Sequence, residues 1–148
     1  MTQRSDRLQL VLEVAQRKEQ KAMEALQACR QKLNQQEQQL DNLRDYQQQY
    51  LNGLKGAMQG RVALQNLQSY HRFVEQLSSA IEQQQQVVVH ARYAFDQARQ
   101  QWLECREKSS SLNDLVQRCR QEEARVREKQ LEKRLEDDLN ARRARSGA

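Results

Sequence analysis

The absence of proline from all 148 residues, together with the grouping of the glycines, constrains the fold of this chain most strongly. Three of the four glycines, Gly53, Gly56 and Gly60, lie within eight residues of one another. Proline and glycine are the residues that most often end helices and form turns, so the chain has few places to turn. We therefore exclude turn-rich architectures such as α/β enzyme domains and β-sandwiches. The 27 glutamines and the 30% of charged residues favour long helices instead.

A heptad repeat of apolar residues runs along both halves of the chain. Steps of four and three residues meet an apolar or aromatic residue at eleven of fourteen positions in the first half and at fifteen of eighteen in the second. A sustained repeat of this kind predicts helices wrapped around each other in a left-handed coiled coil. The first series is Leu8, Leu12, Ala15, Glu19, Ala22, Leu26, Cys29, Leu33, Gln36, Leu40, Leu43, Gln47, Tyr50 and Leu54. The second is Leu67, Tyr70, Val74, Leu77, Ile81, Gln84, Val88, Ala91, Phe95, Ala98, Trp102, Cys105, Ser109, Leu112, Val116, Cys119, Glu123 and Val126.

The glycine cluster separates the two repeats and predicts the place where the chain folds back, since each glycine inside a helix costs about 1 kcal/mol relative to alanine. We expect an all-α single domain, a long antiparallel two-helix coiled-coil hairpin. The predicted elements are a helix over 6–56, a turn over 57–62, a helix over 63–140 and a disordered basic tail over 141–148. A parallel homodimeric coiled coil is the alternative, which a glycine cluster in mid-helix disfavours.

Antiparallel pairing about the predicted turn indicates that the second helix extends beyond the end of the first. It places Leu8 opposite about residue 113 in an antiparallel pair. The stretch from Asp114 to Asn140 should therefore overhang the first helix. Its apolar residues, which after Val126 continue at steps of four as Leu131, Leu135 and Leu139, would have no partner within the chain.

The charge distribution favours solvated helix faces. The net charge of +5 is spread as +2 over residues 1–60, +1 over 61–113 and +2 over 114–148, without a basic patch. A nucleic-acid-binding coiled coil remains an alternative, supported by Arg142, Arg143 and Arg145 near the end of the chain. The cysteines Cys29, Cys105 and Cys119 fall on the heptad positions as small apolar residues, and no disulfide is expected.

The sequence carries no pattern of a catalytic, metal or cofactor site. The glycine-rich stretch lacks the Gly-Lys-Ser/Thr ending of a phosphate-binding loop, and His71 and His90 lie 19 residues apart without a second ligand one helical turn away. A two-helix hairpin also offers no cleft that would tune a general acid or base. We therefore expect no enzymatic activity, no metal and no cofactor. No apolar run has the length of a membrane span and no signal peptide precedes the repeats, which predicts a protein that is cytoplasmic or is exported without a cleaved signal.

Two stripes of larger side chains lie beside the heptad positions near the predicted turn. Antiparallel pairing places them at the same height on neighbouring helices, where they would form one partly exposed patch with three aromatic residues. Exposed apolar patches of this kind often bind other proteins. A widened seam covered by aromatic side chains is the other interpretation, and periodicity favours neither. The stripes are Gln39, Leu43, Tyr46 and Tyr50 on the first helix and Phe73, Leu77, Ala80 and Gln84 on the second.

Two ordered motifs within these stripes carry a family resemblance. The segment 43–50 reads LRDYQQQY and the segment 70–81 reads YHRFVEQLSSAI. With them the chain resembles the FliJ family of flagellar type III export proteins, and residues 102–118 are similar to the third helical block of that family. The chain also resembles the stalk proteins of injectisomes, of the YscO type, but the DYQ and YxxF motifs favour the flagellar branch. The resemblance implies an antiparallel coiled coil like that of the gamma subunit of rotary ATPases.

The resemblance also implies a function and partners. It implies a non-enzymatic stalk that binds the hexameric export ATPase FliI and the export gate protein FlhA, and also export chaperones, at the cytoplasmic face of the inner membrane. Such a stalk promotes protein export for flagellum assembly, and thereby motility and chemotaxis. The stripes above would form the gate-binding surface, with Gln84 where the family often has histidine. A homodimeric scaffold is the remaining alternative. The ATPase-binding end would comprise Leu8, Leu12, Leu115, Arg118, Val126, Leu131 and Leu135.

Overall fold

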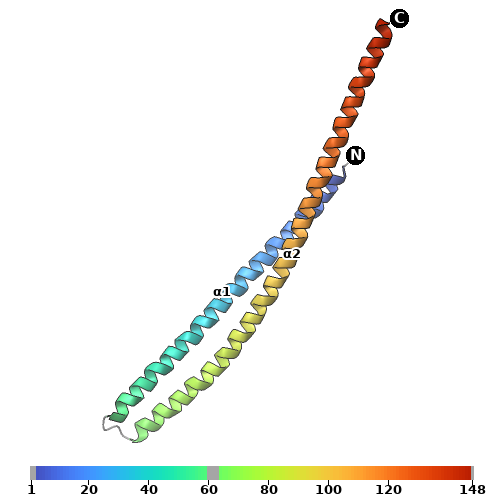
Figure 1. The fold of residues 1–148 in the computed structure, drawn as a ribbon. Helices are drawn as coiled ribbons and strands as arrows, with labels where there is room; N and C mark the ends of the chain where they lie inside the picture. Colours follow the sequence, from blue (N-terminus) through green and yellow to red (C-terminus); the bar gives the residue numbers. More distant parts are fainter. Residues whose placement is uncertain (1–2, 60–63, 148) are drawn as a thin grey trace. The chain divides into compact units, whose positions relative to one another are not determined.

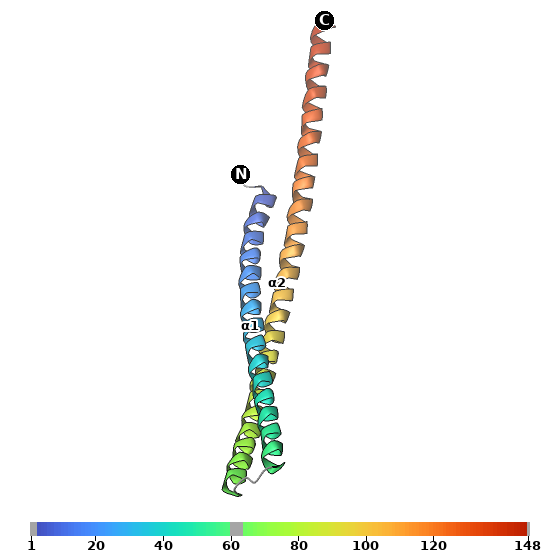
Figure 2. The same ribbon diagram turned by 90° about the vertical axis from the view of Figure 1, so that its left-hand side faces the viewer.

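The computed structural model describes residues 3–59 and 64–147, and nearly all of them lie in two helices (Figure 1). Helix α1 spans Arg4–Gln59 and helix α2 spans Leu64–Ser146. The two long helices pack against each other in antiparallel orientation, which confirms the predicted all-α two-helix coiled-coil hairpin. Figure 2 shows α1 and α2 side by side from a second direction.

The local sequence explains why both helices are so long. Gln, Glu, Lys, Arg, Leu and Ala, which are good helix formers, make up most of each helix, and no proline interrupts them. Asp6 lies in the first turn of α1, and Arg143 and Arg145 lie in the last turn of α2. Each of these charges opposes the partial charge of the helix end at which it sits and thereby stabilises that end.

The hairpin divides into two compact units. The first combines the two chain ends, up to Gln20 on α1 and from Leu103 on α2, and the second comprises Lys21–Trp102. In the second unit, Leu43 and Phe95 pack against a core whose members are Leu33, Leu40, Ile81, Val88 and Ala91. In the first unit the buried residues are Ser5, Leu12, Ala15, Ser109 and Val116.

The predicted heptad positions form the interface between the helices. All fourteen positions of the first series are buried or half-buried, as are seventeen of the eighteen positions of the second. The exception is Val126, whose side chain is 48% exposed because α1 does not extend that far along α2. The repeat of 3.5 residues therefore identifies the buried face of both helices correctly.

Helix α1 ends later than the glycines suggested. Gly53 and Gly56 lie inside α1, which continues to Gln59, so the predicted helix end at residue 56 is too early. Neither of these glycines has a positive φ, and a Cβ at either would meet nothing within 4 Å. Leu54, which lies between them in the sequence, is only 7% exposed, so its packing stabilises this part of α1. Residues 60–63, with Gly60 and half of the predicted turn, lie outside the described residues.

The predicted disordered tail is wrong for its first six residues. Helix α2 continues to Ser146 instead of ending at residue 140. All five residues 141–145 are alanine or arginine, which are among the best helix formers. The positive side chains also stand at the C-terminal end of the helix, where they stabilise its dipole.

The unpaired part of α2 begins later than predicted. Asp114 was expected to start the overhang, yet Val116 is 1% exposed, and Ser5 of α1 hydrogen-bonds with Glu123. Side chains lean toward the N-terminus of their own helix, so Glu123 reaches back toward the first turn of α1. All residues from Arg125 to Gly147 are exposed, and we call the stretch 125–146 the overhang.

Candidate docking surfaces

A shallow groove opens between α1 and α2 within the second unit. Its volume is about 430 Å³. Five of the residues that line it belong to the two predicted stripes, and the sixth, Asn42, does not. Asn42 lies three residues after Gln39 and four before Tyr46, so the helical spacing that identified the stripe could have identified it as well. The lining residues are Gln39, Asn42, Leu43, Tyr46, Phe73 and Leu77.

Four aromatic rings cluster at one end of this groove, around Tyr50. Its ring centroid lies 4.3 Å from that of Phe73, 5.8 Å from that of Tyr46 and 6.0 Å from that of Tyr70. These distances fall in the range of favourable aromatic pairs. Tyr50 is a heptad residue and half-buried, whereas Tyr46, one turn earlier on α1, keeps 55% of its surface exposed. The cluster therefore joins the interface of the helices to an exposed aromatic ring.

The burial of the groove residues separates structural from accessible side chains. Leu77 is 8% exposed and belongs to the buried face of α2, and Leu43 and Phe73 are half-buried. Gln39 and Tyr46 are exposed. A partner that entered the groove would therefore meet Tyr46 and Gln39 first, over a floor formed by the half-buried residues.

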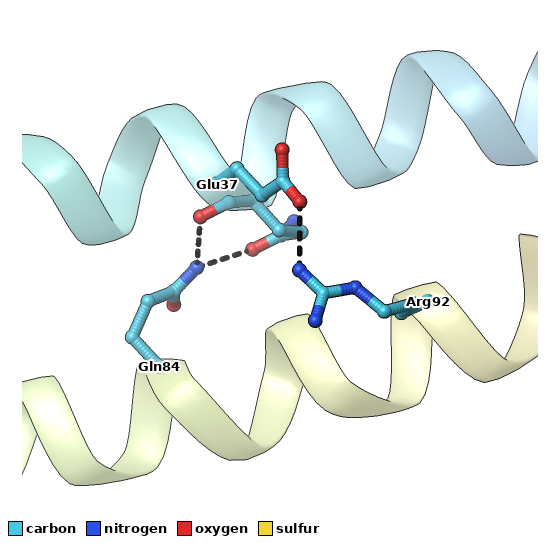
Figure 3. Close-up of polar contacts among 4 residues, drawn as sticks. Glu37, Gln84 and Arg92 are labelled. Carbon is cyan, nitrogen blue, oxygen red and sulfur yellow. Dashed lines mark hydrogen bonds and ion pairs between the residues drawn. The ribbon is translucent and has the colours of Figure 1, made fainter.

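The last two residues of the second stripe, Ala80 and Gln84, do not line this groove. Ala80 lines a separate hollow of about 420 Å³ with Arg72, Glu75, Gln76, Ser79 and Gln83. Gln84 points across to α1 (Figure 3), where its Nε2 donates to the backbone oxygen of Gln36 at 3.0 Å and to its Oε1 at 2.7 Å. Beside this pair, Arg92 and Glu37 form an ion pair at 3.1 Å. The side-chain amide of Gln84 is thus engaged in hydrogen bonds across the interface between α1 and α2.

The end of the first unit carries a second cluster of polar contacts. The carboxylate of Glu123 accepts hydrogen bonds from the Ser5 backbone N–H at 3.1 Å and from the Ser5 hydroxyl at 2.6 Å. Ser5 lies in the first turn of α1, whose amides have no partner within the helix. The two hydrogen bonds lower the pKa of Glu123. Burial raises the pKa of the Cys119 thiol, and the neighbouring Glu123 carboxylate raises it further.

The residues predicted for the ATPase-binding end fall into two groups. Leu12 is buried and Leu8 is half-buried, and both face α2. The other five are exposed to differing degrees. Leu115 is 37% exposed at the edge of the paired part of α2, with Arg118 exposed nearby. The exposed members within the overhang are Val126, Leu131 and Leu135. Among these seven residues, those open to a partner therefore lie on α2.

Two further features bear on the kind of site present. Within residues 3–59 and 64–147, no group of three or more His, Cys, Asp or Glu side chains is arranged to hold a metal ion. In the same part of the chain, neither helix contains a stretch apolar enough to cross a membrane. The candidate sites are thus surfaces of aromatic, aliphatic and amide side chains.

Comparison with known proteins gives one match. The family model described as flagellar FliJ protein matches residues 4–148, which is nearly the whole chain. The searches of curated proteins and of solved structures found no match.

Proposed function

Because the chain belongs to the flagellar FliJ family, we propose that it is a stalk-like coupling protein that binds both the export ATPase and the export gate. Membership of the family makes the chain a component of the flagellar export apparatus. The proposal adds the two partners, the ATPase FliI and the gate protein FlhA, and assigns a surface to each. The groove beside Tyr46 is the observation that carries it.

The groove supports gate binding because it combines an exposed anchor with a firm floor. Tyr46 offers a large, 55% exposed ring, and the ring of Tyr50 stacks on it at 5.8 Å and limits its movement. Side chains held in place before binding lose little conformational freedom in a complex. Tyrosine is also enriched among the residues that dominate interface energies. A groove of about 430 Å³ accommodates a few side chains of a partner.

The variant Tyr46→Ala tests gate binding. It should weaken binding of the purified gate protein by at least about tenfold, because it removes the exposed anchor of the groove. Tyr93→Ala is the matched control, since Tyr93 is a somewhat more exposed tyrosine of the same unit (65%) that does not line the groove. Titration calorimetry measures both affinities, and circular dichroism checks that both variants stay helical. Unchanged affinity of Tyr46→Ala would show that the gate binds elsewhere.

The overhang supports ATPase binding because it exposes apolar side chains of α2 that α1 does not reach. Val126, Leu131 and Leu135 have 48%, 61% and 57% of their surfaces exposed. Leu131 and Leu135 lie one turn apart on one face of α2, and exposed aliphatic residues grouped in this way are typical of a protein interface. The proposed ATPase-binding surface consists of these three residues together with Leu115 and Arg118, while Leu8 and Leu12 hold α1 against α2.

Truncation tests the ATPase-binding surface. A chain that ends at Ala124 keeps the half-buried and buried residues of α2 and the hydrogen bonds between Ser5 and Glu123, whereas a chain that ends at Asn140 also keeps the exposed leucines. The shorter chain should fail to co-sediment with the purified ATPase, and the longer one should co-sediment like the full chain. Equal binding of both truncated chains would refute the assignment of the overhang.

The proposal includes a non-enzymatic role at the cytoplasmic face of the inner membrane, where the chain would also meet export chaperones. A general acid requires a raised carboxyl pKa, whereas hydrogen bonds from Ser5 lower the pKa of Glu123. This carboxylate therefore acts as a structural partner of the helix end.

A further inference from the structure

A second groove lies between α1 and α2 within the second unit, and its lining is positively charged. Its volume is about 610 Å³, and each helix contributes one arginine to it, Arg30 from α1 and Arg99 from α2. Among the described residues, no acidic side chain lines this groove. We call it the arginine groove. Its apolar lining residues are Met23, Leu26, Leu33, Phe95 and Trp102.

The two guanidinium groups of the arginine groove are open to a partner. Both side chains are exposed, and in the part of the chain that the structure describes neither Arg30 nor Arg99 forms an ion pair. Arg92, one heptad before Arg99, differs because it pairs with Glu37 at 3.1 Å. Two uncompensated positive charges therefore border one groove, and their combined field favours an anionic partner.

The floor of the arginine groove consists of large apolar side chains that the hairpin covers only in part. Leu26, Phe95 and Trp102 are half-buried heptad residues, and they alternate with alanine and cysteine along the two repeats. A small side chain at every second heptad position cannot cover its large neighbours completely. A partner with apolar side chains would remove the remaining surface of these residues from water, which favours binding.

The shape of the groove favours a helix as its occupant. Helix α1 lines it from Met23 to Asn34, 12 residues that span about 18 Å, so the groove follows the helix axis for about three turns. A helix that lies along such a groove presents its side chains at the same spacing of three and four residues. A volume of about 610 Å³ admits a few of these side chains.

We propose that the arginine groove binds an acidic amphipathic helix of a partner protein. The apolar face of that helix lies on Phe95 and Trp102, and carboxylates on its two flanks meet Arg30 and Arg99. A guanidinium group binds a carboxylate through two parallel hydrogen bonds, so the arginines select an acidic flank on each side. The apolar contact contributes affinity, and the charges decide which helices bind.

This groove fits a different partner from the groove beside Tyr46. Of the residues that the structure describes, none that lines the groove beside Tyr46 is charged. The proposal therefore concerns a third surface and stands independently of gate and ATPase binding. A nucleic acid fits the arginine groove less well, because five of its nine lining residues are apolar and only two are basic.

Trp102 allows binding to be measured in the groove itself, because it is the only tryptophan of the chain. The probe is a tryptophan-free, alanine-rich helical peptide of about 20 residues, with leucines at heptad spacing and glutamates on both flanks. It should shift the Trp102 emission to shorter wavelength, since its leucines displace water from the ring. A peptide with lysine in place of each glutamate should bind at least about tenfold more weakly. A peptide with alanine in place of each leucine should leave the emission unchanged.

Charge reversal in the groove tests the two arginines. Arg30→Glu and Arg99→Glu should each weaken binding of the glutamate peptide by at least about tenfold, and a chain with both substitutions should prefer the lysine peptide. Arg72→Glu is the matched control, because Arg72 is an exposed arginine of the same unit that does not line this groove, and it should leave binding unchanged. Circular dichroism checks that all variants stay helical.

Four outcomes would overturn the proposal. Equal binding of the glutamate and lysine peptides would show that the arginines do not select the partner. An equal loss with Arg72→Glu would show that only the net charge matters. Loss of peptide binding in Tyr46→Ala would place the peptide in the other groove. A single-stranded thymidine oligonucleotide that shifts the Trp102 emission at a lower concentration than the glutamate peptide would identify a nucleic-acid site instead.

Discussion

At the residue scale, polar side chains on heptad positions set the details of the interface between the helices. Gln84 donates to Gln36, and the Nε2 of Gln47 donates to the Ser78 hydroxyl at 2.8 Å. A half-buried amide that lost its partner would leave a polar group desolvated, so each of these pairs favours one register of α1 against α2. The third polar contact, between Glu123 and Ser5, does the same at the end of α1.

The Glu123 contact predicts how stability depends on pH. Because the folded state lowers the pKa of Glu123 below its ordinary value of 4.5, its contribution is present above that value and is lost as the pH falls through the lowered pKa. Glu123→Gln should therefore lower the melting temperature at about pH 7 and have much less effect at about pH 3. Thermal melts followed by circular dichroism measure this, with Glu122→Gln, an exposed neighbour, as control. An equal loss at both pH values would show that the charge of Glu123 is not what stabilises the end of α1.

At the scale of the helices, the glycines of α1 reduce its stability without serving the turn. Gly53 and Gly56 are helical, have no positive φ and leave open space where a Cβ would stand. Their cost is the conformational entropy that glycine loses when it enters a helix. The end of α1 therefore keeps its helical form through packing contacts such as those of Leu54, rather than through the propensity of its residues.

Replacement of these glycines by alanine should stabilise the hairpin. Gly53→Ala and Gly56→Ala should each raise the free energy of unfolding by about 0.5–1 kcal/mol, because no clash opposes the new methyl group. Urea denaturation measures the change. Gln48→Ala is a control on the exposed face of the same helix and should have a smaller effect. Destabilisation by either glycine replacement would mean that α1 needs the freedom of glycine here after all.

The sequence predicted the buried faces of the helices better than their ends. Periodicity identifies the buried face because every turn of the helix repeats the signal, from Leu12 to Val116. An end depends on a few residues, and here glycine propensity pointed to a break that the packing of Leu54 overrides. Likewise, the stripe spacing found Tyr46 and Phe73. The spacing also assigned Ala80 and Gln84 to the same surface, although neither lines the groove, because residues one turn apart can lean toward different neighbours.

At the scale of the whole molecule, the division into two units has consequences for stability. Each unit has its own buried residues, with Ile81 among the core of the second and Val116 the most deeply buried of the first. In a coiled coil each helical turn packs only against nearby turns, so no single residue contacts the whole buried interface. Local opening of one unit is therefore expected to leave much of the other folded.

Core truncation in each unit tests this independence. Ile81→Ala should reduce amide hydrogen-exchange protection by about 2–5 kcal/mol in the second unit, and Val116→Ala should reduce protection in the first by a smaller amount, since it removes fewer side-chain carbon atoms. Exchange measured by mass spectrometry assigns each loss to a segment. Loss of protection throughout the chain in both variants would indicate a single cooperative unit instead.

The position of Tyr50 has a thermodynamic consequence. Its ring belongs to the packing between α1 and α2 and also supports the exposed ring of Tyr46. A partner that binds Tyr46 only while the hairpin is closed stabilises that closed state by mass action, by about 2.7 kcal/mol at a hundred times its dissociation constant. Occupancy of the groove and fraying of the adjacent helix ends are therefore linked equilibria, in which each opposes the other.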